Sequence, residues 1–93
     1  MEMSKEAVIY KYPMKITDRQ TVELGLGDKP LSVQFQNGKL VMWAMHYPND
    51  LPKLRNFAIY GTGHKITHEC GGYIGTAQQP INGLVWHVFE VWA

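Results

Sequence analysis

The chain has 93 residues, with nine basic and eight acidic side chains, so its formal net charge is +1 at pH 7. This near balance excludes a long-range field that would gather duplex nucleic acid or an anionic membrane. A chain of this length builds one hydrophobic core, and we therefore expect a single domain over residues 1–93.

Seven segments rich in β-branched and aromatic residues alternate with Gly, Pro and Asn, as strands do with turns. In chain order the predicted strands cover residues 7–12, 20–24, 31–36, 39–47, 55–60, 73–78 and 84–92. Residues 16–24 are the one helical candidate, but their β-branched residues and a nearby glycine pair favour a strand or an irregular turn. The sequence predicts an all-β fold, a compact antiparallel β-sandwich or small barrel of about seven strands with little or no helix.

The Asn-Gly pair at 37–38 predicts a two-residue type I′ hairpin, because both central positions of that turn need a positive φ. The resulting register pairs Gln36 with Lys39 and ends with Leu31 opposite Ala44. One face is then wholly apolar and is the predicted core face: Leu31, Val33, Phe35, Leu40, Met42 and Ala44.

A second Asn-Gly pair, at 82–83, predicts a hairpin with Gln79 opposite Trp86 and Tyr73 opposite Trp92. Pro80 lacks an N–H group, so a longer loop with another register stays open. The predicted core side of this hairpin carries Ile74, Thr76, Gln78, His87, Phe89 and Val91. The last predicted strand is apolar on both sides, which places it in the centre of a sheet or with one face against another chain.

The segment IYGTGHKITHEC, residues 59–70, holds the residues that look most like chemistry. Glycines permit close backbone approach, so the N–H groups of Gly61, Thr62, Gly63 and His64 could bind a phosphate. The segment lacks the helix N-terminus and the lysine spacing of strong phosphate-binding motifs. The alternative is a turn that ends the preceding strand.

The same segment contains metal-ligand types in His64, His68, Glu69 and Cys70. Positions four apart on a strand are separated by about 13 Å, too far to chelate one ion, so only a loop could bring them together. We predict no metal and no cofactor, and leave open whether His64, His68 and Cys70 ever bind a metal.

No catalytic residue is assigned, and the chain is expected not to be an enzyme. Cys70 with His68 or His64 could form a nucleophile and a base, but no third group is placed to orient the imidazole. The carboxylates are scattered singly along the chain and do not form a catalytic pair. His46 and His87 lie inside predicted strands and are expected to be packed or half-buried rather than reactive.

Two tryptophans lie beside amides on the predicted hairpins: Trp43 near Ser32 and Gln34, and Trp86 near Gln79, Tyr73 and Glu90. Aromatic rings beside amides bind planar ligands or anchor protein interfaces, although tryptophans also fill small cores. The predicted ligand-binding residues are Gly61, Thr62, Gly63, His64, Tyr60, Trp43 and Trp86. The predicted interface residues are Gln34, Gln79 and Tyr73, and self-association into a homo-oligomer is expected.

The apolar runs are too short to span a bilayer, and the first residues lack a signal-peptide h-region and a cleavage site. One cysteine cannot form an internal disulfide bond, which fits a reducing compartment. We expect a cytoplasmic protein without a membrane partner.

Five segments succeed one another in order: YKYPMKITDRQTVEL, LSVQFQNGKLVMWA, FAIYGTGHKI, YIGTAQ and VWHVFE. Together they resemble a family of small proteins of tailed phages and prophages, from Tyr10 to Glu90, with Tyr-Gly-Thr-Gly-His and His-Val-Phe-Glu motifs. Members of that family tend to have acidic residues where this chain has Thr67, His68, Glu69 and Cys70.

The resemblance implies a phage accessory protein in the host cytoplasm that counters host immunity by stoichiometric binding. Its partner would be a host defence protein or the nucleotide messenger of that defence. The preferred hypothesis is sequestration of a cyclic nucleotide, with the phosphate at the Gly61–His64 loop and the base on Trp43, Trp86 or Tyr60. The alternatives are a protein-directed inhibitor of the anti-CRISPR type and a minor structural component of the phage.

Overall fold

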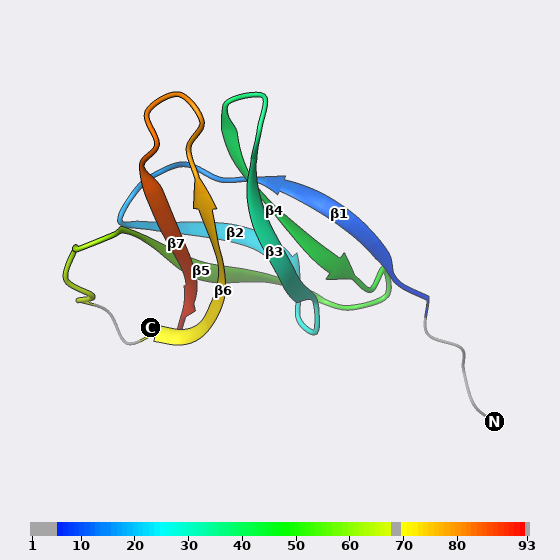
Figure 1. The fold of residues 1–93 in the computed structure, drawn as a ribbon. Helices are drawn as coiled ribbons and strands as arrows, with labels where there is room; N and C mark the ends of the chain where they lie inside the picture. The colour runs from blue at the N-terminus through cyan, green and yellow to red at the C-terminus, as the bar shows by residue number, and fades with distance from the viewer. Residues whose placement is uncertain (1–5, 68–69, 93) are drawn as a thin grey trace.

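Seven antiparallel strands in two sheets make up the part of the chain that the computed structural model describes, residues 6–67 and 70–92. The strands are β1 (Val8–Pro13), β2 (Arg19–Gly25), β3 (Lys29–Gln36), β4 (Lys39–His46), β5 (Pro52–Gly61), β6 (Cys70–Gln78) and β7 (Val85–Val91). One sheet has the order β1-β4-β3 and the other β2-β5-β7-β6 (Figure 1). The predicted all-β fold is confirmed, and these residues include no helix that could cross a membrane.

The β3–β4 hairpin has the predicted turn and, for most of its length, the predicted register. Asn37 and Gly38 have φ of 52° and 78°, as a type I′ turn requires. The pairing runs as predicted from Gln36 and Lys39 as far as Ser32 and Trp43. A bulge then interrupts the ladder, so Pro30 rather than Leu31 lies opposite Ala44.

The predicted register of the β6–β7 hairpin is wrong by two residues. Trp86 lies opposite Ala77 rather than Gln79. The strands are closed by a 2.7 Å hydrogen bond from the N–H of Gln79 to the carbonyl of Leu84. The loop therefore has the four residues 80–83, which is the longer alternative that the sequence left open. Pro80 takes its first position, where the fixed φ of proline suits a turn and no N–H is needed.

The core side predicted for β7 is also wrong. Trp86 and Val88 face the main core, whereas Phe89 and Val91 lie on the opposite face of the sheet in a smaller cluster. Ile74 packs against the main core, on the opposite face from its neighbour Tyr73, which pairs with Phe89. A bulge between residues 73 and 75 then puts Gly75, opposite Val88, on the core side as well. Both faces of β7 are apolar, so alternation along the strand could not decide which face is inside.

The main core lies between the two sheets. Its buried members are Met14, Leu24, Val33, Leu40, Met42, Phe57, Ile59, Ala77 and Val88. The sheets come closest where β3 runs beside β6 (Figure 1). A Cβ atom on Gly75 would lie 3.0 Å from Cγ2 of Val33, so the two backbones approach here because position 75 has no side chain.

The smaller cluster lies on the outer face of the four-stranded sheet. Ala58, Tyr60 and Val91 are buried there, and Phe89 packs against them. β7 lies between β5 and β6, as its two apolar faces predicted. The outer face therefore combines an apolar cluster with the end of β5, where the chain leaves the sheet.

Candidate functional site

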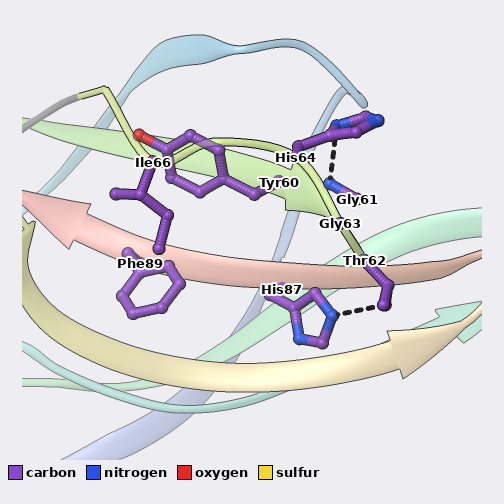
Figure 2. A pocket seen from close by; sticks show the side chains of 8 residues that line it. All are labelled: Tyr60, Gly61, Thr62, Gly63, His64, Ile66, His87 and Phe89. Atoms are coloured by element: carbon purple, nitrogen blue, oxygen red, sulfur yellow. Dashed lines mark hydrogen bonds between the residues drawn. The ribbon is translucent and has the colours of Figure 1, made fainter.

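A pocket of about 280 Å³ opens where β5 ends and the chain turns away from the sheet. We call it the glycine-turn pocket; it is lined by Tyr60, Gly61, Thr62, Gly63, His64, Ile66, His87 and Phe89 (Figure 2). Tyr60 lies opposite His87 in the β5–β7 ladder, and Figure 2 shows Ile66 beside the rings of Tyr60 and Phe89. Five of the predicted ligand-binding residues therefore come together: Tyr60, Gly61, Thr62, Gly63 and His64.

The N–H groups of the glycine turn are largely bound within the protein. Gly61 donates to Nδ1 of His64 at 3.1 Å, and the N–H of His64 donates back to the carbonyl of Gly61 at 3.0 Å. The N–H of Thr62 donates to the carbonyl of Val85 at 3.3 Å. Three of the four N–H groups of the predicted phosphate cradle therefore close the turn instead.

The ring of His64 points away from the rings that line the pocket. It lies over Gly61, so closely that a Cβ at this position would be 2.8 Å from Cε1 of His64 (Figure 2). It also meets Trp86 edge-on, with ring centroids 6.4 Å apart. Because Gly61 has no side chain, the imidazole of His64 can lie against the backbone at position 61 and contact Trp86.

The histidine whose ring faces the pocket is His87, which was expected to be packed or half-buried and is half-buried. Its Nε2 and the hydroxyl of Thr62 are 2.8 Å apart, and its Nδ1 and the hydroxyl of Thr76 are 3.1 Å apart. The hydroxyl of Thr76 is in turn 2.6 Å from that of Tyr73. One hydrogen-bonded chain therefore crosses the outer face and fixes the imidazole. The sequence did not predict this chain of hydrogen bonds. β7 is apolar on both faces, so its alternation does not show which way His87 points, and Thr62 is 25 positions away along the chain.

Trp43 does not reach the glycine-turn pocket. It lies on β4 in the other sheet, half-buried and opposite Ser32 and Lys11. Gln34 is exposed on the same sheet, two residues along β3 from Ser32. The predicted ligand surface is therefore divided between the two sheets.

Trp86 and Tyr73, which were predicted to share one binding face, lie on opposite faces of their sheet. Trp86 packs partly against the main core and donates from Nε1 to Oε1 of Gln79 at 3.1 Å. Tyr73 is exposed on the outer face and meets Phe89 edge-on, with ring centroids 5.5 Å apart. Tyr73 is thus the predicted interface residue that lies on the same face as the pocket.

The predicted metal-ligand set cannot be assembled from the described residues. His68 and Glu69 lie outside them, and the side chain of Cys70 is not described. Among the residues that the structure does describe, no three His, Cys, Asp or Glu side chains converge as a metal site requires.

A second group of polar side chains, not found from the sequence, is buried at the turn between β2 and β3. Asp28 is only 4% exposed, and its carboxylate accepts hydrogen bonds from Nδ1 of His46 at 2.6 Å and from the N–H groups of Gly25 and Tyr47 at 2.7 and 3.0 Å. Burial acts to raise the pKa of Asp28, but the hydrogen bonds from His46 and the two N–H groups outweigh it and hold that pKa below its ordinary value.

Arg55 extends this buried group to the four-stranded sheet. Its Nε and Nη2 donate to the two carboxylate oxygens of Glu90 at 2.6 and 2.8 Å. Its Nη1 donates to the carbonyl oxygens of Asp28 and Gly25 at 2.7 and 3.2 Å. The hydrogen bonds to Glu90 raise the pKa of Arg55, so the guanidinium stays charged. We call Asp28, His46, Arg55 and Glu90 the Asp28 network.

A protein-family model with the description Domain of unknown function (DUF7352) matches residues 5–93 of the chain. No curated protein and no solved structure matches it.

Proposed function

The chain belongs to the DUF7352 family, and we propose that it acts by stoichiometric binding to another protein, through the glycine-turn pocket and the outer face around it. The observation that carries this proposal is the character of the pocket. Its walls are the rings of Tyr60 and Phe89 with the side chain of Ile66, and no lysine or arginine is among the lining residues. A recess of this kind accepts an uncharged ring, such as an aromatic anchor of a partner protein.

Sequestration of a cyclic nucleotide is less well supported by this geometry. At about 280 Å³ the pocket is at the small end of ligand sites and suits one ring system rather than a dinucleotide. The phosphates would need cations or free N–H groups, and three N–H groups of the turn are already bonded within the protein. The rings of Tyr60 and Phe89 and the hydroxyls beside His87 would still suit a nucleobase. The test must therefore distinguish binding of a partner protein from capture of a nucleotide.

The setting of the proposal is the one that the phage resemblance implies, namely inhibition of a host defence protein in the host cytoplasm. A surface that blocks a partner needs an anchor pocket with a polar rim, and it needs no turnover. Thr62, Thr76 and Tyr73 supply hydroxyls beside the aromatic pocket.

The experiment compares two variants in which an exposed isoleucine becomes aspartate. Ile66→Asp places a charge at the pocket, where Ile66 is 55% exposed, and Ile81→Asp places one on the β6–β7 loop outside the pocket lining, where Ile81 is 87% exposed. Affinity-tagged protein is expressed in the host and its bound partners are quantified. We expect wild type and Ile81→Asp to retain the same host protein in a stoichiometric complex and Ile66→Asp to lose it.

A parallel thermal melt of purified protein with a panel of cyclic di- and trinucleotides tests the rival function. We expect no change in Tm at high micromolar concentration. A rise in Tm that Ile66→Asp removes, with no partner protein retained by wild type, would replace the proposal with nucleotide capture.

A further inference from the structure

A second open site lies near the end of β2, beside the turn that leads into β3. It is a cleft of about 470 Å³, which we call the histidine cleft, and it is lined by Tyr12, Glu23, Leu24, Gly25, His46, Pro48, Asp50 and Pro52. None of these residues lines the glycine-turn pocket. Binding at the histidine cleft is therefore independent of the proposed function.

His46 is held in one orientation at the wall of this cleft. Its Nδ1 lies 2.6 Å from Oδ2 of Asp28, whose side chain is fully buried, and one face of its ring stacks on Tyr10 with centroids 5.1 Å apart. In the neutral imidazole, a carboxylate on Nδ1 selects the tautomer with its proton there, and Nε2 is then an acceptor. In the described part of the chain Nε2 has no hydrogen-bond partner, and 23% of the side chain is exposed.

The other polar groups that line the cleft are also mainly acceptors. Glu23 is an exposed carboxylate on β2. Asp50 uses Oδ2 to accept the N–H of Gly27 at 2.8 Å, and its second oxygen remains available. Arg55 uses four of its five N–H donors on Glu90 and on two backbone carbonyls. The described residues that line the cleft therefore include one imidazole, two carboxylates and two prolines, and no lysine or arginine.

We propose that the histidine cleft binds an organic cation rich in N–H donors, a guanidinium or an alkylammonium group, with Nε2 of His46, Glu23 and Asp50 as its acceptors. A guanidinium has five N–H donors and no acceptor, so it matches a site made of acceptors, and its flat face packs against proline and tyrosine side chains. The cation is either free or the side chain of an arginine in a partner protein.

The test is an NMR titration of isotope-labelled protein with three probes. Agmatine, which carries a guanidinium and an ammonium group, is the free cation. A Gly-Arg-Gly peptide blocked at both ends carries the protein-borne guanidinium, and the same peptide with citrulline in place of arginine is the neutral isostere. We expect agmatine and the arginine peptide to give saturable shifts at His46 and Tyr12, and the citrulline peptide to give none. Tighter binding of the peptide would assign the site to a partner's arginine, and tighter binding of agmatine to a free cation.

Three variants test the residues. Asp50→Asn keeps an oxygen that accepts the N–H of Gly27 but removes the negative charge of Asp50. Glu23→Gln removes the negative charge of Glu23. Each variant should lower the affinity for agmatine about fivefold. His46→Asn keeps an N–H near Asp28 and removes Nε2, and should weaken it as well. Asp18→Asn, exposed just before β2 begins, is the control and should leave the affinity unchanged.

Three results would overturn the proposal: no saturable shift at His46 with either cation, equal binding of the citrulline peptide, or equal weakening by Asp18→Asn and Asp50→Asn. Because Asp50→Asn and Glu23→Gln leave Asp28 and its partners untouched, they decide the matter even if His46→Asn does not fold.

Discussion

Asp28 is the residue on which the hydrogen bonds of the β2–β3 turn converge. Its carboxylate accepts one imidazole N–H and two backbone N–H groups, and its backbone carbonyl accepts Arg55. A buried anion with a full set of donors is stable only while each donor stays in place. The turn is therefore held as one unit with the end of β4 and the middle of β5.

Replacing Asp28 with asparagine should destabilise the protein by about 3 kcal/mol, because the amide cannot accept all three donors and leaves buried groups unpaired. Urea unfolding followed by tryptophan fluorescence measures the loss. Asp18→Asn, at an exposed turn, should change the free energy of unfolding by less than about 0.5 kcal/mol. Equal effects of the two variants would contradict the role given to Asp28.

Acid should weaken the fold through the same carboxylate. The pKa of Asp28 is lower in the folded protein than its ordinary value, so the unfolded chain takes up this proton at a higher pH than the folded chain does. The stabilisation is present above the unfolded value, about pH 4, and is lost as the pH falls through the lower folded value. Urea unfolding between pH 2 and 6 should show a decline on acidification that is shallower in Asp28→Asn.

The Asp28 network could not be predicted from the sequence. Arg55 and Glu90 are 35 positions apart, and His46 is 18 positions from Asp28, so no short-range spacing joins them. Each residue alone resembles an ordinary surface charge. By contrast, Tyr60, Gly61, Thr62, Gly63 and His64 are continuous in the chain, so the sequence could predict that they lie together.

At the scale of single elements, the two hairpins show how far turn chemistry fixes register. In the β3–β4 hairpin Asn37 and Gly38 both have positive φ, and the observed pairs from Gln36 back to Ser32 agree with that turn. In the β6–β7 hairpin the same dipeptide lies in a four-residue loop, where Gly83 has a positive φ and Asn82 does not. Pro80 occupies the first position of that loop, where its fixed φ suits a turn, so the chain begins to turn before it reaches the Asn-Gly pair.

Alanine at Gly38 should destabilise the protein by about 1 kcal/mol, because φ of 78° is costly for a residue with a Cβ. Gly72→Ala is the matched control, since no atom lies within 4 Å of its added Cβ and its φ is not in the left-handed region. We expect the control to lose no stability in thermal and urea unfolding. A loss at Gly72 as large as that at Gly38 would contradict the turn assignment.

At the scale of the whole molecule, the exposed apolar side chains are distributed over more than one surface. β1 is an edge strand, and Val8, Ile9 and Tyr10 are all exposed on it. An apolar edge strand with unpaired backbone groups is a template for pairing with another chain. Together with the apolar outer face of β7, this supports the predicted homo-oligomer.

Purified protein should elute with a mass above that of one chain when light scattering is measured during size-exclusion chromatography. Ile9→Lys, at a side chain that is 59% exposed on the edge strand, should shift the mass to that of one chain, because a lysine on an edge opposes strand pairing. Ile81→Lys is the control and should not. A wild-type mass of one chain at all concentrations would contradict the oligomer.

Because β7 has apolar side chains on both faces, the sequence could not predict which of its faces meets the other sheet. The sequence shows that β7 is apolar on both sides, which is enough to place it in the centre of a sheet. Which side meets the other sheet depends on the bulge in β6 and on the close approach of β3 at Gly75. Both are tertiary features, and the position of Trp86 against the core results from them.

The most direct test of the proposed binding surface is site-specific photocrosslinking in host cells. A benzophenone amino acid replaces Ile66 at the glycine-turn pocket or, as the control, Ile81 on the β6–β7 loop. We predict one discrete covalent adduct with a host protein from position 66 and none from position 81. Adducts of equal yield from both positions, or no adduct from position 66, would contradict the proposed binding surface.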